Sequence, residues 1–168
     1  MPLNQIKKYN QLLELNAYTQ KQRTVCLRQI YDRDIVPKER IVFRNKPLNP
    51  TPHENKIDLD RHFFHLTTKT IDEKTKQRDY DKERCERLHW IKFHIEEKNK
   101  ENILVFSVKE PTGIKTYIYD TIEKYVIVLE PLSKINEYYL LTAYLVRGRD
   151  RAKDKFIKKY KRKLDVVY

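Results

Sequence analysis

Residues 125–130 (YVIVLE) and 137–146 (EYYLLTAYLV) decide the fold that the sequence predicts. Both runs are rich in β-branched and aromatic residues, and residues 131–136 between them contain Pro and Asn, which favour turns. Two shorter runs of the same kind, residues 102–108 and 115–119, precede them. Four such runs joined by short turns predict a four-stranded antiparallel meander.

Helices are expected before and after this meander in the sequence. Residues 4–31 carry apolar residues at approximate helical spacing, and an interruption at residues 16–19 can divide them into two helices. Residues 79–98 predict one long helix, because an Asp can cap its start and apolar side chains recur at intervals of three and four. Residues 149–163 predict a basic C-terminal helix.

The segments between these elements are less regular. Residues 37–60 contain four of the seven prolines, which predicts a loop with one short strand near residues 41–43. Residues 61–68 (RHFFHLTT) predict a strand or an irregular approach to one, and residues 71–80 are polar and expected to be exposed. The expected fold is α+β in one domain: N-terminal helices, a long helix, a four-stranded antiparallel meander and a basic C-terminal helix.

Positive charge collects at the two ends of the chain. Residues 147–168 carry ten Lys or Arg and three Asp or Glu, a net charge of +7, and residues 1–56 carry a net charge of +6. Residues 57–146 sum to −1, although the whole chain carries +12. This distribution is typical of a protein that binds a polyanion such as nucleic acid.

Scarce residue types exclude several functional classes. Only Gly113 and Gly148 occur, which excludes glycine-rich phosphate loops and Rossmann fingerprints. Cys26 and Cys85 lie far apart and suggest neither a disulfide framework nor a zinc site. No apolar run approaches the roughly 18 residues of a membrane span, and the N-terminus lacks the apolar core of a signal peptide. We therefore expect a cytoplasmic protein without membrane contact, although a toxin delivered by a dedicated secretion route has the same features.

The histidines do not have the spacing of a metal site. His62 and His65 share a side of a helix but not of the strand expected there, and His89 and His94 do not share a helix face well. Neither an HExxH nor a CxxC motif is present, and the acidic residues form no convincing set at strand ends. The sequence therefore predicts neither a metal nor a cofactor.

Cleavage of RNA without a metal needs few groups, because the attacking 2′-hydroxyl is already in the substrate. It needs a base for the hydroxyl proton, a cation for the developing charge on phosphorus and an acid for the leaving oxygen. Histidine, arginine, tyrosine and threonine can serve. The candidate catalytic residues are His65, Arg84, Thr142 and Tyr144. The candidate substrate-binding residues are His62, Arg87, Lys115, Tyr117, Tyr119, Arg147 and Arg149.

Three motifs follow one another in an order that resembles a known family. After RHFFHLTT come the residues Asp81, Arg84, Cys85, Arg87, Leu88, Trp90 and Ile91, and then a final strand with Leu141, Thr142, Ala143 and Tyr144. They are similar to the D-x-x-R-A-x-R-hydrophobic-x-W-hydrophobic run and the V-T-A-Y-type last strand of the barnase–EndoU–colicin–RelE (BECR) nucleases, especially their phage-associated branch. Cys85 stands where that family has a small alanine.

The resemblance covers residues 57–147. It implies metal-independent RNA cleavage, with a histidine, a basic residue and a hydroxyl of the last strand in the active centre. In this interpretation residues 57–168 form the nuclease domain, which includes the basic C-terminal helix. Residues 1–56 form an N-terminal extension of helices and loops that could hold an immunity or antitoxin protein.

Three functional interpretations remain open. The first is a metal-independent endoribonuclease, a toxin-like or phage-encoded effector that acts on tRNA or another RNA. The second is a nucleic-acid-binding module of the same fold that does not catalyse the reaction. The third is a protein-interaction domain, such as a phage or host-takeover factor whose basic surface binds an acidic protein. The residues have structural alternatives too: His65 can be a half-buried strand histidine, and Arg84 and Arg87 can form surface ion pairs.

Overall fold

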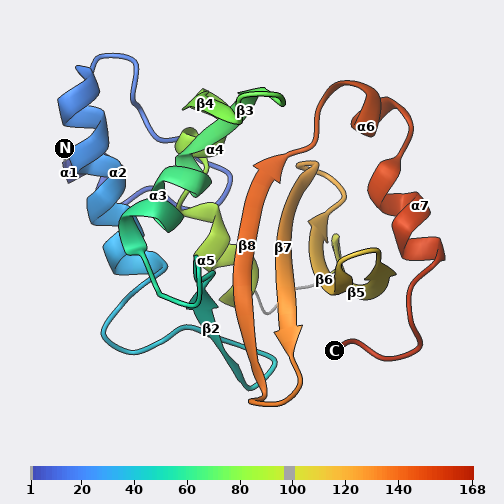
Figure 1. Ribbon diagram of the computed structural model, residues 1–168. Helices are drawn as coiled ribbons and strands as arrows, with labels where there is room; N and C mark the ends of the chain where they lie inside the picture. The colour runs from blue at the N-terminus through green and yellow to red at the C-terminus, as the bar shows by residue number, and fades with distance from the viewer. Residues whose placement is uncertain (1, 97–100) are drawn as a thin grey trace. The chain divides into compact units, whose positions relative to one another are not determined.

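The computed structural model describes residues 2–96 and 101–168, which form an α+β protein (Figure 1). They divide into two compact units. The first unit comprises the chain up to Ile41 together with Pro50–His94, and the second comprises Val42–Asn49 together with the chain from Ile95 onward. The boundary expected at residue 56, between an N-terminal extension and a nuclease domain, concerns function and stays a prediction.

A six-stranded sheet forms the second unit, in the order β1-β2-β8-β7-β6-β5. Its strands are β1 (Val42–Phe43), β2 (Lys46–Pro50), β5 (Ile103–Glu110), β6 (Gly113–Asp120), β7 (Tyr125–Leu132) and β8 (Glu137–Leu145). Strands β5 to β8 are antiparallel neighbours in chain order. One row across them pairs Phe106 with Tyr117, Tyr117 with Val128 and Val128 with Thr142, so these side chains lie on one face of the sheet.

Two short helices follow the sheet, α6 (Gly148–Ala152) and α7 (Lys155–Lys161). The prediction of a single helix over residues 149–163 is wrong. Asp154, between α6 and α7, has a left-handed backbone conformation with φ 48°, which interrupts the helix. Phe156 of α7 is buried in the cluster that covers the sheet face, and its ring lies 5.6 Å from that of Tyr117 and 5.3 Å from that of Tyr119. The basic tail is therefore attached to the sheet by an aromatic anchor.

The predicted architecture is wrong, because the four strands of the expected meander are only part of a larger sheet. Residues 46–50, expected to be a loop because of Pro47 and Pro50, form β2 next to β8. Proline cannot donate to a strand ladder, but β1 is two residues long and pairs with β2 only at Lys46 and Pro47. Pro50 lies beyond this pairing, where β2 has a single strand neighbour and a missing N–H is more easily tolerated, whereas Pro47 lies within the pairing.

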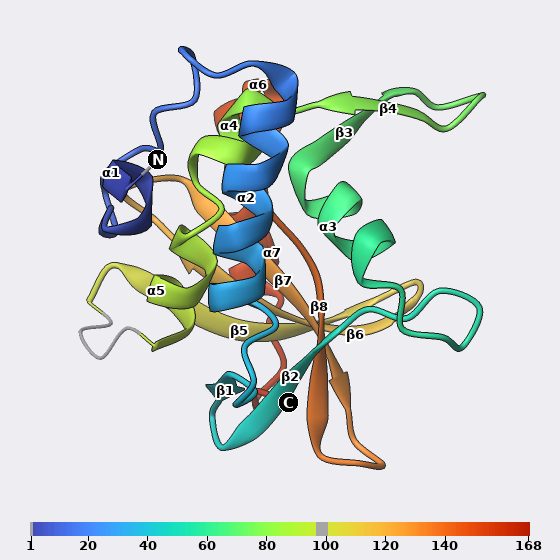
Figure 2. The same cartoon turned by 90° about the vertical axis from the view of Figure 1, so that its left-hand side faces the viewer.

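The first unit is mainly helical, with α1 (Pro2–Gln5), α2 (Gln20–Asp34), α3 (Leu59–Thr67), α4 (Lys82–Glu86) and α5 (Trp90–Glu96). Thr19 and Gln22 form a reciprocal capping box at the start of α2. A two-stranded hairpin, β3 (Thr68–Asp72) and β4 (Gln77–Tyr80), extends directly from the end of α3 (Figure 2). Among the described residues, no helix is long and apolar enough to cross a bilayer.

The N-terminal prediction is wrong for residues 6–19, which are not an α-helix. Leu13 and Leu15 are buried while their neighbours are exposed, which is the alternation of an extended segment. The Leu13 N–H donates to the carbonyl of Glu86, 3.0 Å away, and this bond holds the segment against the region around α4. In a run as short as residues 11–15, the same leucine positions fit both the spacing of a helix and the alternation of an extended segment. Packing against the rest of the unit selects the extended form.

The segment RHFFHLTT is also helical rather than a strand. Asp58 caps α3 by accepting from the N–H of Arg61, and the buried residues His62 and Leu66 lie four apart. The hydroxyl groups of Thr67 and Thr68 then donate to carbonyls of the last turn. The aromatic and β-branched residues that favoured a strand are therefore accommodated at the end of a helix.

The long helix expected over residues 79–98 is broken between α4 and α5, and its last two residues lie outside the described ranges. Leu88, His89, Trp90 and Ile91 are four consecutive buried residues. A continuous surface helix would point them in all directions, so it could not bury all four against one neighbour. The break allows the Trp90 indole N–H to donate to the carbonyl of Gln11 at 3.1 Å.

Candidate functional site

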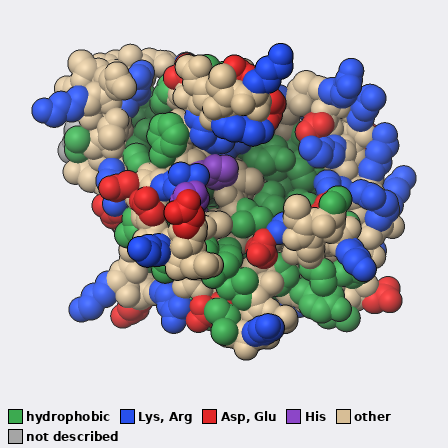
Figure 3. All heavy atoms as spheres, in the orientation of Figure 1, with side chains coloured by type: hydrophobic (Ala, Val, Ile, Leu, Met, Phe, Trp, Pro, Cys, Tyr) green, Lys and Arg blue, Asp and Glu red, His purple; other side chains and the backbone are tan. Residues whose placement is uncertain are grey.

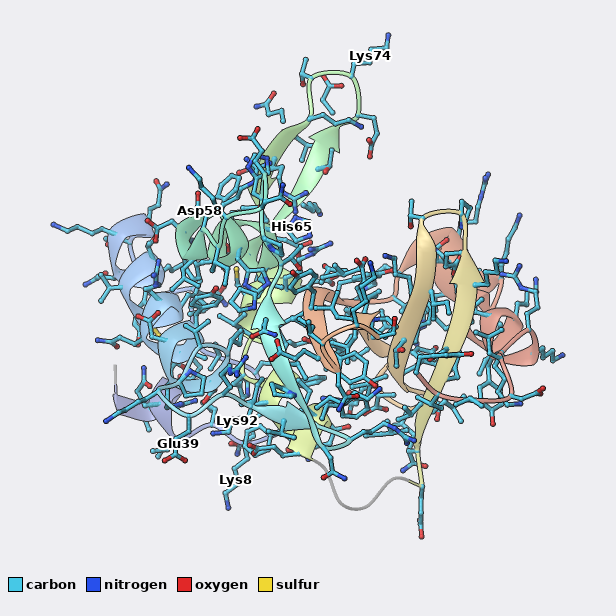
Figure 4. The ribbon with its side chains drawn as sticks, turned by 60° about the horizontal axis from the view of Figure 1, so that its bottom comes forward. Lys8, Glu39, Asp58, His65, Lys74 and Lys92 are labelled. Carbon is cyan, nitrogen blue, oxygen red and sulfur yellow. The ribbon has the colours of Figure 1, made fainter. Side chains whose placement is uncertain are left out.

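His65 and two arginines meet at the end of α3 in the first unit, and we call them the His65 centre (His65, Arg78 and Arg84). His65 lies in the last turn of α3, below the β3–β4 hairpin whose tip carries Lys74 (Figure 4). Nη2 of Arg78 and Nη1 of Arg84 donate to the backbone carbonyl of His65 at 3.2 Å and 3.3 Å. The hairpin and α4 thus bring both guanidinium groups to one histidine.

Arg78 is held mainly by neutral oxygen atoms. Its Nε and Nη1 donate to the hydroxyls of Thr68 and Thr70 at 2.8 Å and 3.0 Å, and its Nη2 also donates to the carbonyl of Thr68 at 2.6 Å. These bonds give Arg78 a structural role, since they satisfy carbonyls at the end of a helix. They also fix its guanidinium group without neutralising its charge. Arg84 differs, because its Nε lies 3.5 Å from a carboxylate oxygen of Asp81.

The pKa of His65 is lowered to about 4, first by burial and then by the positive charges of Arg78 and Arg84. His65 is therefore neutral at pH 7 and can accept a proton. An anion bound at the two arginines would offset the repulsion that opposes the imidazolium form. The His65 centre thus combines a neutral base with fixed positive charge, which are two of the three groups that phosphodiester cleavage without a metal requires.

The other candidates of the first unit lie in packed positions. His62 is 3% exposed, and its Nδ1 shares a hydrogen bond of 2.8 Å with the hydroxyl of Tyr31. Arg87 is the residue that ends α4; it donates to the carbonyl of Glu83 at 3.1 Å and lies 5.2 Å above the Trp90 ring. Both arrangements are those of structural residues, and the substrate contacts expected of His62 and Arg87 stay predictions.

A pocket of about 370 Å³ lies beside β8 in the second unit, and we call it the β8 pocket. Its lining includes four of the candidates: Lys115, Tyr117, Thr142 and Tyr144. Lys155 and Lys159 of the basic tail also line it, together with Glu110 at the end of β5. Side chains that lie far apart in the sequence are thus gathered by the antiparallel register and by the packing of α7.

Charged groups in the β8 pocket are matched with one another. Glu110 accepts from the hydroxyl of Tyr117 at 2.8 Å and from the ammonium group of Lys159. Burial opposes ionisation of Glu110, but these two hydrogen bonds outweigh it and hold its pKa below the ordinary value. Burial and the bond to Glu110 raise the pKa of Tyr117, so its hydroxyl can donate but does not act as a base at pH 7.

The other two lysines of the β8 pocket also have acidic partners. Lys115 pairs with Glu130, and Lys155 pairs with Asp150 at 2.7 Å. An incoming phosphate must compete with these carboxylates for the ammonium groups. The β8 pocket is therefore suited to salt-sensitive contacts with a nucleic-acid backbone.

The remaining candidates of the second unit lie in two different environments. Tyr119 is 4% exposed and belongs to the core that packs on Phe156. Arg147 and Arg149 are exposed at the start of α6, where Lys and Arg side chains gather over α6 and α7 (Figure 3). Tyr119 is thus placed as a core residue, whereas the two arginines are placed where a polyanion can reach them.

Sequence reasoning missed Arg78, Lys155 and Lys159. Arg78 lies in a segment that was expected only to be polar and exposed. The pattern that could have indicated its place is a hairpin in which Thr68 and Thr70 alternate on one strand and Arg78 faces them from the other. The two lysines were included in the basic tail but not assigned to a site. Their spacing of four with Phe156 between them indicates one helix turn packed against the sheet.

Comparison with protein-family models, with curated proteins and with solved structures found no match. In the described part of the chain, no three or more His, Cys, Asp or Glu side chains are grouped as metal ligands. The metal-free reaction and the family resemblance both remain predictions.

Proposed function

We propose that the protein is a metal-independent endoribonuclease whose chemistry is carried out at the His65 centre. The single observation that carries the proposal is that Arg78 and Arg84 both bind the backbone carbonyl of His65, whose imidazole is kept neutral by burial and by their charges. The resemblance of residues 57–147 to the BECR nucleases supports the same reaction. The distribution of charge along the chain supports a nucleic acid as substrate.

In the proposed reaction, His65 accepts the proton of a ribose 2′-hydroxyl as that oxygen attacks the neighbouring phosphorus. The bond between phosphorus and the 5′-oxygen breaks, and the 5′-oxygen takes a proton from water. The products are a 2′,3′-cyclic phosphate and a 5′-hydroxyl, and the imidazolium of His65 then returns its proton to water. Arg78 and Arg84 stabilise the additional negative charge that forms on the phosphate oxygens. The same phosphate raises the pKa of His65 toward neutrality, where a general base is most effective.

The β8 pocket is proposed to bind the RNA backbone through Lys155 and Lys159. Support comes from the three lysines in its lining, whose ion pairs with carboxylates a phosphate could replace. The catalytic roles expected of Thr142 and Tyr144 stay predictions, supported by their place in the lining of this pocket.

Incubation of the purified protein with total tRNA and with an unstructured RNA, in the presence of EDTA, tests the proposal. Discrete fragments that end in 2′,3′-cyclic phosphates are expected from the wild type. His65→Ala should cleave roughly 10²- to 10⁴-fold more slowly, because that is the usual contribution of a general base. His53→Ala is the matched control, since His53 lies in a loop of the same unit and pairs with Lys56 through its backbone. Intact RNA, or equal cleavage by all three proteins, would contradict the proposal.

A second candidate is a module that binds RNA without cleaving it. The observation that favours it is the pKa of His65 near 4, which makes the free imidazole a weak base. In that case RNA stays intact in the cleavage assay but shifts on a native gel, and the shift weakens steeply with salt concentration.

A further inference from the structure

The first unit contains a pocket of about 260 Å³ between α2, α3 and β4. We call it the α2–α3 pocket. Its apolar lining comes from Leu27, Phe63 and Phe64, and Tyr80 adds a further aromatic ring. Pockets that enclose a drug-sized ligand have volumes of roughly 300–1,000 Å³. The α2–α3 pocket therefore has room for a smaller group.

Aromatic and polar groups of this pocket are arranged as a stacking site. Phe64 remains 50% exposed although it lines the pocket. The guanidinium group of Arg23 lies 4.4 Å from the centre of the Tyr80 ring, so one wall is already a stacked cation and aromatic pair. Gln20 and Asp79 line the pocket with an amide and a carboxylate, which can donate to and accept from the edge of a ring.

Arg78 links this pocket to the His65 centre. It lines the α2–α3 pocket, and its Nη2 donates to the carbonyl of His65. Phe64 directly precedes His65 on α3, so the two side chains leave the helix about a quarter-turn apart. Arg78 is therefore shared by the α2–α3 pocket and the His65 centre.

We propose that the α2–α3 pocket binds one nucleobase of single-stranded RNA, the base of a nucleotide adjacent to the phosphate at the His65 centre. The base stacks on Phe64, and Arg23 and Arg78 provide positive charge that complements the attached backbone. This inference rests on the proposed function for its ligand, an RNA strand. It adds that the protein binds unpaired nucleotides and not only a phosphate backbone.

The test uses a short single-stranded RNA that is 2′-O-methylated to block cleavage and carries a single 2-aminopurine, whose fluorescence is quenched on stacking. The 2-aminopurine is moved through the sequence one position at a time. Wild type should quench it at one position, and Phe64→Ala should lose that quenching and bind about ten-fold more weakly, as expected for a lost base stack. Phe64→Leu preserves apolar packing without the aromatic face and should behave like Phe64→Ala.

Phe93→Ala is the matched control, because Phe93 is 37% exposed on α5 of the same unit and its ring contacts His89. It should bind and quench as the wild type does. Equal quenching and affinity in wild type, Phe64→Leu and Phe93→Ala would overturn the inference, and so would an absence of quenching in the wild type.

Cleavage of unmodified RNA separates this inference from the proposed function. A wild type that quenches through Phe64 but leaves RNA intact would preserve the base site and refute the nuclease. A wild type that cleaves RNA but shows no quenching that depends on Phe64 would preserve the nuclease and refute the base site.

Discussion

The His65 centre and the β8 pocket both collect basic side chains, but they balance the charge differently. Arg78 of the His65 centre is held by hydroxyl and carbonyl oxygens, and the positive charge there lowers the pKa of His65. In the β8 pocket Lys159 is paired with Glu110, and the pKa of that carboxyl is lowered instead. Arg84 of the His65 centre also lies 3.5 Å from a carboxylate oxygen of Asp81, so the two regions differ at Arg78, whose bonds are to neutral oxygens. The number of basic residues therefore does not identify the reactive site.

This difference assigns separate roles to the two regions. A phosphate at the His65 centre relieves repulsion between positive charges and shifts the protonation of a base. A phosphate at the β8 pocket exchanges one anionic partner for another, so its net gain is small and depends on salt. We therefore expect the first region to determine the rate of cleavage and the second to adjust affinity.

The largest effect is expected for Arg78. Arg78→Ala should reduce kcat for RNA cleavage roughly 10²- to 10³-fold, the usual loss when one fixed donor to a developing oxyanion is removed. Arg78→Lys should recover only part of the rate, since an ammonium group lacks the planar fork that binds two oxygens. Lys69→Ala, on the same hairpin and exposed, is the control for a general loss of charge. Equal kcat in Arg78→Ala and Lys69→Ala, with thermal unfolding unchanged, would remove Arg78 from the centre.

A smaller effect is expected for Lys159 in the β8 pocket. Lys159→Gln should weaken RNA binding several-fold without changing kcat, and the slope of log affinity against log salt should become less steep by about one ion. Lys158→Gln removes the same charge from an exposed neighbour on α7. A kcat that falls for Lys159→Gln but not for Lys158→Gln would contradict the division of roles and place the β8 pocket in the chemical step.

A third effect concerns stability. The pKa of His65 is about 4 in the folded protein against an ordinary value of 6.5, so the unfolded chain binds more protons between these pH values. The free energy of unfolding should therefore decrease as pH falls from 6.5 toward 4. Urea denaturation at pH 7 and pH 5 measures the decrease, and His65→Gln should make it smaller. His89 also has a lowered pKa, so part of the decrease should persist in that variant.

The sequence predicted strand segments better than it predicted helices. Regular runs such as residues 125–130 lie within a strand of the sheet, because alternation and β-branching act in the same direction there. Helix predictions failed where the buried residues do not lie along one face of a helix. Leu88 to Ile91, four consecutive buried residues, are the example. The strand β2 was missed because its prolines suggest a loop, and its pairing with β8 cannot be seen in the sequence.

Candidate residues could be chosen by type from the sequence, but their neighbours could not. His65 was selected as a histidine in an aromatic segment, whereas its partner Arg78 depends on the register of a hairpin that had not been predicted. Tyr117 and Tyr119 share one face of β6, yet Tyr117 lines the β8 pocket and Tyr119 is covered by Phe156. Whether a tyrosine of β6 lines the pocket or is covered depends on where α7 packs. The periodicity of a strand in the sequence does not show where a later helix packs.

The pKa of His65 tests the account most directly. Nuclear magnetic resonance of the histidine ring during a pH titration should give a value near 4 for the free protein. With a non-cleavable 2′-deoxy oligonucleotide bound, the pKa should rise toward 6.5, because the phosphate offsets the charges of Arg78 and Arg84. A pKa near 6.5 in the free protein, or a value that does not change on binding, would contradict a base held neutral at a phosphate site.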